Sequence, residues 1–124
     1  MKNMKLNTIT RFLNKELKIR SILDTSRNGL QVKSNEEVKK IGFAVDACLT
    51  TFQKANKLGV DLLIVHHGVK WIPQKRRELS KNRINYLKKN KISLYAAHLP
   101  LDAHYKYGNN IGLANILELK NIKQ

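Results

Sequence analysis

The short apolar segment Val60–Val65 constrains the fold more than any other part of the chain. Gly59 stands directly before it, where it can end a helix, and two histidines followed by Gly68 stand directly after it. A near-continuous apolar run of this length is typical of a strand that is buried on both faces, as in a parallel sheet. We therefore expect a central parallel strand here.

Helices and strands alternate along the rest of the sequence. Apolar residues at helical spacing predict helices over residues 5–20, 49–58, 79–90 and 111–117. Extended apolar patterns predict strands over residues 30–32, 38–45, 60–65 and 92–97. This order predicts the α/β class: a three-layer-like domain whose mostly parallel or mixed sheet is flanked by helices. Because no repeat or linker interrupts it, we expect residues 1–124 to form a single α/β domain.

Composition excludes several classes of protein. The chain has 124 residues, of which 42% are hydrophobic, so it can bury a core. No apolar run approaches the ~18–20 residues of a membrane-spanning helix, and the first residues lack the apolar core of a signal peptide. The single cysteine, Cys48, can form no internal disulfide and cannot build a Cys-rich zinc site. We expect a cytoplasmic protein without a membrane partner.

The charge is strongly positive. Twenty-four basic residues against nine acidic ones give a net charge of +15. Nine Lys or Arg residues and one acid, Glu78, lie in residues 70–91, including the triplet Lys75–Arg77. Such a segment can guide a phosphate-bearing ligand or contact a nucleic-acid backbone non-specifically. Since base-reading motifs are absent, a solvated helix face and loop is the simpler explanation.

All four histidines of the chain lie in a window of 39 residues, between positions 66 and 104. His66 and His67 follow one predicted strand directly, His98 follows another, and Asp102 and His104 come soon after. In parallel α/β sheets, sites form outside the carboxyl ends of the strands. Neutral imidazole together with carboxylate suits zinc, iron, manganese or nickel, which the ligand types do not distinguish, better than calcium.

The adjacent positions of His66 and His67 predict where their two rings point. Successive residues of an extended chain point to opposite sides, so the two rings are expected to serve two ions rather than one. Two-metal sites hold their ions roughly 3.5–4 Å apart, a gap that neighbouring residues can straddle. The alternative is a pair of ordinary polar residues at a strand end. The clustering of every histidine with an aspartate favours metal binding.

Three further residues have open roles. His98 and His104 are candidates for proton transfer, although each can instead orient a ligand through its second nitrogen. Asp46 follows the predicted strand 38–45, on the same edge of the sheet. It can accept a hydrogen bond from a ligand or cap the next helix, and capping is the more common use.

These motifs resemble the N-terminal half of a known family. The segments that carry the resemblance are Asn28–Val32, Ile41–Asp46, Asp61–Gly68, Ala97–His104 and Gly108–Asn110. The family is that of the dinuclear-metal proteins known as GTP cyclohydrolase I type 2 homologues, also called the Nif-three-like family. The likeness covers the chain from about residue 5 onward, and the His-His-Gly and His-Leu-Pro-Leu-Asp motifs are its most specific parts.

The resemblance implies divalent metal ligands at His66, His67 and Asp102, with His98 close by and two ions in a complete site. It also implies an α/β fold, a ring-like homo-oligomer and a cytoplasmic location. Members of the family continue into a second half that carries a His-x-x-x-Glu pair. The present sequence ends at Gln124 without that pair. We therefore expect either a separate polypeptide equivalent to the C-terminal half or a truncated chain.

Three functions are compatible with these features. The first is a metal-dependent hydrolase acting on a nucleotide-like or phosphorylated substrate, in which a metal-bound water with a pKa near ~7 attacks. The second is a non-catalytic, metal-stabilised binding or regulatory module that contacts nucleic acid or protein. The third is an inactive half-protein.

Overall fold

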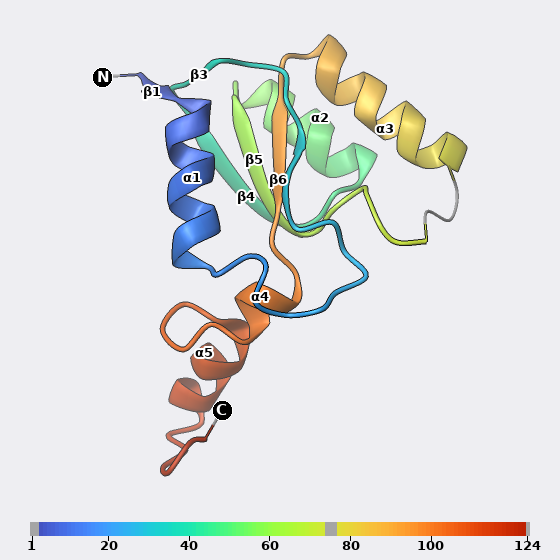
Figure 1. The fold of residues 1–124 in the computed structure, drawn as a ribbon. Coiled ribbons are helices and arrows are strands. Elements are labelled where there is room, and N and C mark those ends of the chain that lie inside the picture. Colours follow the sequence, from blue (N-terminus) through green and yellow to red (C-terminus); the bar gives the residue numbers. More distant parts are fainter. Residues whose placement is uncertain (1–2, 74–76, 124) are drawn as a thin grey trace.

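The computed structural model describes residues 3–73 and 77–123, and it confirms an α/β fold with a mixed sheet (Figure 1). The helices are α1 (Leu6–Glu16), α2 (Leu49–Lys57), α3 (Arg77–Lys89), α4 (Leu99–Asp102) and α5 (Asn109–Ile116). The strands are β1 (Met4–Lys5), β2 (Gly29–Val32), β3 (Glu37–Val38), β4 (Ile41–Asp46), β5 (Leu62–His67) and β6 (Ser93–Ala96).

The main sheet has the strand order β2-β6-β5-β4. Strands β4, β5 and β6 are parallel, whereas the edge strand β2 runs antiparallel to β6. Strand β5 lies in the middle, as expected, and Leu62, Leu63 and Val65 are at most 2% exposed. It extends two residues beyond the predicted end, because the ladder with β4 continues to the pair Asp46–His67.

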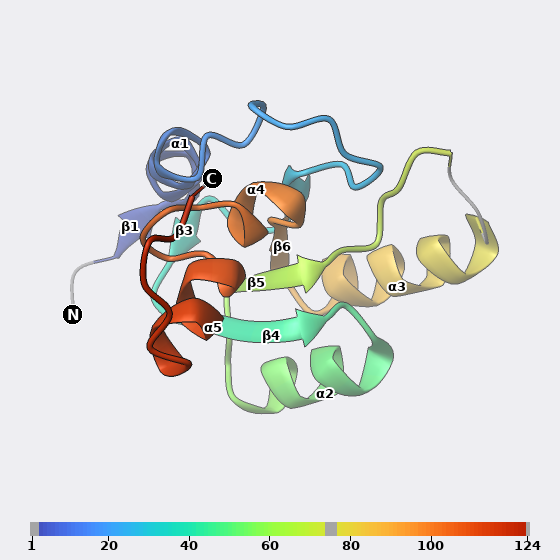
Figure 2. The same cartoon turned by 90° about the horizontal axis from the view of Figure 1, so that it is seen from below.

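Helices cover both faces of the sheet, as the three-layer prediction requires (Figure 2). On one face, α2 and α3 place Phe52 and Leu87 against the sheet. On the other face, α1 packs against the sheet beside the β2 edge through Leu6 and Ile9. The fully buried Tyr95 lies beneath α1 and donates a hydrogen bond of 2.8 Å to Asn14 Oδ1. The core is therefore two apolar layers separated by the sheet.

The half of this second face nearest to β4 is not covered by a helix. Ile41, Phe43 and Val45 point to the same side of β4 and are 39%, 78% and 62% exposed. Helix α5 projects away from the sheet, beyond the carboxyl ends of the strands (Figure 1). Its residues Leu113 and Ile116 are exposed as well. The fold thus leaves an apolar surface, made by β4 and α5, in contact with solvent.

Several element boundaries differ from the prediction. Helix α1 ends at Glu16 rather than at residue 20, and Lys18 adopts a left-handed φ of 47°. The predicted strand 38–45 is divided into β3 and β4. The backbone amides of Lys39 and Lys40 both donate to Asp61 Oδ2, which forms a turn between the two strands. Strand β1 and the short helix α4 were not predicted, and β3 begins one residue before the predicted strand.

In the part of the chain that the structure describes, no helix combines the length and apolar character needed to cross a lipid bilayer.

Candidate metal centre

Three histidines converge at the carboxyl edge of the sheet. His66 and His67 end β5, and His98 follows β6. Their ring centroids are 4.6 Å apart for His66 and His67, 4.9 Å for His66 and His98, and 5.4 Å for His67 and His98. Each ring offers one nitrogen within 4.8 Å of the corresponding nitrogens of the other two. The predicted meeting of two strand ends is therefore present.

Each of the three rings is held at Nδ1 by an oxygen acceptor. These bonds run from His66 Nδ1 to Ala97 O at 3.0 Å, from His67 Nδ1 to Asp46 Oδ1 at 2.7 Å, and from His98 Nδ1 to Asp24 Oδ1 at 3.0 Å. Carbonyl and carboxylate oxygens can only accept, so each Nδ1 carries the proton. This leaves the Nε2 atom of each ring as the nitrogen available to a metal ion.

The expectation that His66 and His67 serve two ions rather than one stays a prediction. Their Cβ atoms do alternate across the strand, but they are the last two residues of β5. The bond to Ala97 draws one ring towards the β6 side and the bond to Asp46 fixes the other beside β4. One nitrogen of each ring nevertheless lies within 4.8 Å of the other, so the pair can contact one ion or two neighbouring ions.

Asp46 accepts a hydrogen bond from His67 and does not cap the next helix. The parallel register places it directly beside His67 on the neighbouring strand. The residue at the start of α2 is Cys48, and no side chain caps that helix. The sequence pattern alone favoured capping because the register between β4 and β5 cannot be derived from it.

Asp24 is a site residue that the sequence reasoning missed. Its carboxylate accepts hydrogen bonds from Ser26 N, Asn28 Nδ2, His98 Nδ1 and Leu99 N. Burial raises the pKa of the Asp24 carboxyl, but the four hydrogen bonds outweigh burial and lower the pKa to about 2. The group is therefore a carboxylate at neutral pH. The one available signal was its place in a turn-rich segment before Asn28-Gly29.

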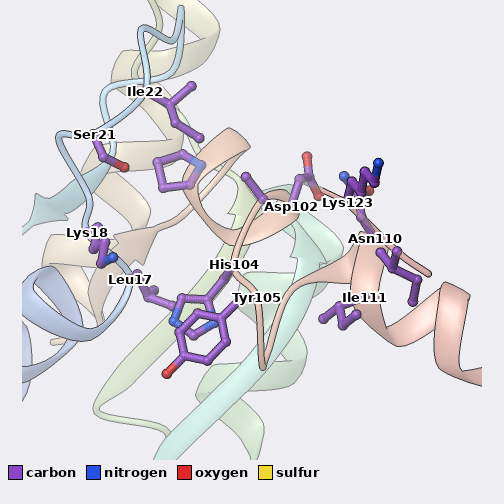
Figure 3. A pocket seen from close by; sticks show the side chains of 13 residues that line it. Leu17, Lys18, Ser21, Ile22, Asp102, His104, Tyr105, Asn110, Ile111 and Lys123 are labelled. Carbon is purple, nitrogen blue, oxygen red and sulfur yellow. The ribbon is translucent and has the colours of Figure 1, made fainter. Parts of the chain in front are cut away.

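Asp102 lies beside the histidine cluster, at the end of α4. Its Oδ2 atom is 3.5 Å from His66 Nε2, and its Oδ1 atom accepts a hydrogen bond of 2.7 Å from Asn109 Nδ2. Asp102 also lines a cavity of about 590 Å³ between the end of α1 and the segments α4 and α5 (Figure 3). The carboxylate thus stands between the imidazole cluster and a solvent-filled space.

The structure does not bring His104 to this cluster. The residue is 6% exposed, and its ring lies against that of Tyr105 (Figure 3) and that of Tyr107. His104 Nε2 donates to Glu16 O at 3.0 Å, and His104 Nδ1 accepts from the backbone amides of Lys106 and Tyr107. Both nitrogens are occupied by backbone groups, so the ring connects the loop after α4 to the end of α1.

Gln31 fixes the backbone that carries the histidine pair. This buried side chain accepts from Val69 N at 2.7 Å and from Lys70 N at 3.1 Å, and it donates to Arg27 O at 2.8 Å. A Cβ atom on Gly68 would lie 2.3 Å from Gln31 Oε1, so only glycine permits this approach. The side-chain amide of Gln31 therefore connects the loop before β2, which contains Asp24, to the segment that follows His67.

The Trp71 ring packs beside the histidine cluster. Its ring centroid is 5.2 Å from that of His98, and its Nε1 donates to Gly68 O at 2.9 Å. Of the predicted basic triplet, Lys75 and Arg76 lie outside the described residues, and Arg77 begins α3.

Fold and site together define an α/β protein with three histidines and three aspartates gathered at the carboxyl edge of its sheet. The chain belongs to the Duf34/NIF3 (NGG1p interacting factor 3) family, whose profile matches residues 4–124. This result confirms the resemblance that the motifs indicated.

The curated relatives are about twice as long as this chain. A "GTP cyclohydrolase 1 type 2 homolog" from Archaeoglobus fulgidus is 50% identical over 108 residues, which cover 86% of this chain and 44% of the relative. A protein of the same name from Escherichia coli K12 is 41% identical over 116 residues, covering 92% of this chain and 47% of the relative. The chain therefore spans about half the length of the curated relatives that it matches.

Solved structures agree with the fold. A protein from Thermus thermophilus superposes with a TM-score of 0.89 and 44% identity, covering 97% of this chain and 50% of that one. Reduced HcgD from Methanocaldococcus jannaschii superposes with a TM-score of 0.85 and 35% identity, covering 99% and 50%.

The role of Gln31 can be tested by Gln31→Leu. The change leaves the buried amide of Val69 without an acceptor, which costs about 1–3 kcal/mol of unfolding free energy. Urea denaturation should show this loss, and hydrogen exchange should speed up at Val69 and Lys70. Gln53→Leu, on the exposed side of α2, is the matched control and should change neither measurement. Unchanged exchange at Val69 in the Gln31 variant would contradict the assignment.

Proposed function

We propose that this chain binds a divalent transition-metal ion through the Nε2 atoms of His66, His67 and His98, with the Asp102 carboxylate as a further ligand. The observation that carries the proposal is the shared pattern of the three rings. Each is tied at Nδ1, and one nitrogen of each ring lies within 4.8 Å of the corresponding nitrogens of the other two. This is the arrangement in which metal-ligating histidines are usually held.

The donor set fits such an ion in number and chemistry. Metal–imidazole bonds are about 2.0–2.1 Å long, so two nitrogens on one ion lie at most about 4.2 Å apart. Nitrogens within 4.8 Å of one another need only a small closing movement of the rings. Neutral imidazoles with one carboxylate favour zinc, iron, manganese or nickel. A second ion would need ligands that we assign to a polypeptide equivalent to the other half of the relatives.

The reaction that we propose for the completed site is hydrolysis of a nucleotide-like or phosphorylated substrate. The bound ion would supply a water whose pKa is lowered towards ~7. The residues of this chain would orient the metal ligands. Asp24 holds the His98 ring, Asp46 holds the His67 ring, and Trp71 covers one side of the cluster. The alternative is a non-catalytic, metal-stabilised module that uses the same residues. Substrate turnover by the completed assembly would support the hydrolase, and metal binding without turnover would support the module.

Metal binding is tested by changing His66 and His67 together to Ala. Removing two of three imidazoles should abolish tight binding, so metal per chain should fall from about one to near zero by elemental analysis. His104→Gln is the control, because both nitrogens of that ring bond to backbone groups and not to the histidine cluster; it can lower stability but should keep the metal. Equal metal in the wild type and in the double variant would refute the assignment.

We also propose that the apolar surface of β4 and α5 packs against a polypeptide equivalent to the second half of the relatives. Exposed apolar surfaces of this kind mark association sites. A hollow of about 190 Å³, lined by Phe43, Val45 and Leu101, lies in this surface and reaches His66. A partner that covers the hollow would therefore come close to the metal ligands.

Without that partner, the purified chain should self-associate through the same surface. Light scattering over a range of concentrations should show oligomers, and Phe43→Ser with Val45→Thr should shift them towards monomer. Leu23→Ser is the control, because Leu23 is 99% exposed in a loop away from the sheet. A monodisperse wild-type monomer at every concentration would count against this surface.

A second candidate function is non-specific binding of nucleic acid. Among residues 3–73 and 77–123, Lys33–Glu36 is the only pairing of a Lys or Arg with a carboxylate. Burial lowers the pKa of Lys70, and the neighbouring cations Arg27 and Lys88 lower it further. This uncompensated positive charge favours a polyanion as partner.

DNA retention should then fall steeply with salt and should not require metal. If residues 75–77 make the contact, changing all three to Ser should reduce the salt slope by about 0.9 per lost phosphate contact. Changing Lys5, Arg11 and Lys15 to Ser removes the same charge elsewhere and serves as control. Asp102→Ala should weaken metal binding and leave DNA retention unchanged. Retention that disappears on chelation would instead point to the metal as the phosphate contact.

A further inference from the structure

We infer that Asp24 is the positioning residue of the metal centre, which holds His98 so that its Nε2 atom faces the cluster. The inference rests on the proposed metal binding and assigns a role to a residue in the loop before β2. Asp24 itself is no ligand in this assignment, because its carboxylate is turned to the far side of the His98 ring.

The contacts of Asp24 leave its carboxylate in one orientation. The side chain is 3% exposed, and its two oxygens accept from four donors at 2.9–3.2 Å. A carboxylate with this many donors cannot turn without breaking several hydrogen bonds. It therefore gives His98 Nδ1 an acceptor with a fixed position.

The backbone of His98 is held from the same loop. His98 N donates to Asn28 Oδ1 at 2.7 Å, and Asn28 Nδ2 donates to Asp24 Oδ2 at 2.9 Å. Leu99 N, the next amide, donates to Asp24 as well. Main chain and ring are thus both tied to this loop, and one side of the ring is left for a ligand. This arrangement selects the tautomer with the proton on Nδ1.

The comparison with Asp46 shows why Asp24 matters more. Asp46 makes the equivalent bond to His67, but its side chain is 65% exposed, against 3% for Asp24. Water competes for the exposed bond and can replace it. No such replacement is available where the carboxylate is buried, so loss of Asp24 should disturb its histidine more than loss of Asp46.

The test measures Zn²⁺ affinity by competition with a chromophoric chelator and the visible spectrum of the Co²⁺ form. Asp24→Asn should weaken Zn²⁺ binding about 10- to 100-fold, the usual effect of losing such a partner. It should also change the Co²⁺ bands, since the ligand geometry changes. Asp46→Asn should have a smaller effect. Leu23→Ser, which changes the exposed neighbour of Asp24 and keeps the Asp24–His98 bond, is the control and should leave Zn²⁺ affinity unchanged.

A double-variant cycle separates positioning from general loss of structure. If Asp24 acts through His98, then Asp24→Asn should weaken Zn²⁺ binding little further when His98→Ala is already present. Equal losses of affinity in the two backgrounds would overturn the inference, as would equal effects of Asp24→Asn and Asp46→Asn.

A measurement on the unmodified protein keeps the inference testable even if the variants fold poorly. Long-range ¹H–¹⁵N spectra of the metal-free chain should show the His98 proton on Nδ1, and the opposite tautomer would overturn it. Failure of the proposed function looks different: the wild type would then take up no metal. Metal uptake that depends on His66 and His67 but not on Asp24 would overturn the positioning role alone.

Discussion

The parallel pairing of β5 between β4 and β6 is the constraint on which the rest of the structure depends. Its side chains alternate between the two apolar layers, so neither face of the strand can be exposed without opening the core. The register places Asp46 beside His67 and Ala96 beside Val65. Three strand ends therefore reach one edge together, and the site is a consequence of how the core is packed.

Polar groups gathered at a partly buried edge must find partners, because each unpaired buried group is unfavourable by about 1–3 kcal/mol. The structure meets this requirement with acceptors from the neighbouring segments: Ala97 after β6, Asp46 at the end of β4, and Asp24 before β2. Gln31 does the same for the backbone of the two loops. These bonds stabilise the edge and also orient the rings, so stability and ligand geometry have a common physical origin.

Local pattern predicted the elements whose environment is uniform along their length. The buried strand β5 and the helices α2 and α3 are examples, because periodic burial leaves a periodic sequence. The division of 38–45 into β3 and β4 was missed because it depends on Asp61, which lies more than twenty residues away. Asp24 was missed for a similar reason. Only the antiparallel placement of β2 beside β6 brings the loop before β2 to the carboxyl ends of the other strands.

The sequence by itself determined the class of fold, the family, and the edge at which the histidines and Asp102 gather. Residue type and strand order suffice for these, because parallel strands end on one side of a sheet. The tertiary structure decided which nitrogens are free, that one nitrogen of His66 lies within 4.8 Å of one of His67, and that His98 rather than His104 joins them. Those properties depend on hydrogen bonds between segments distant in the chain, and local sequence carries no record of which segments become neighbours.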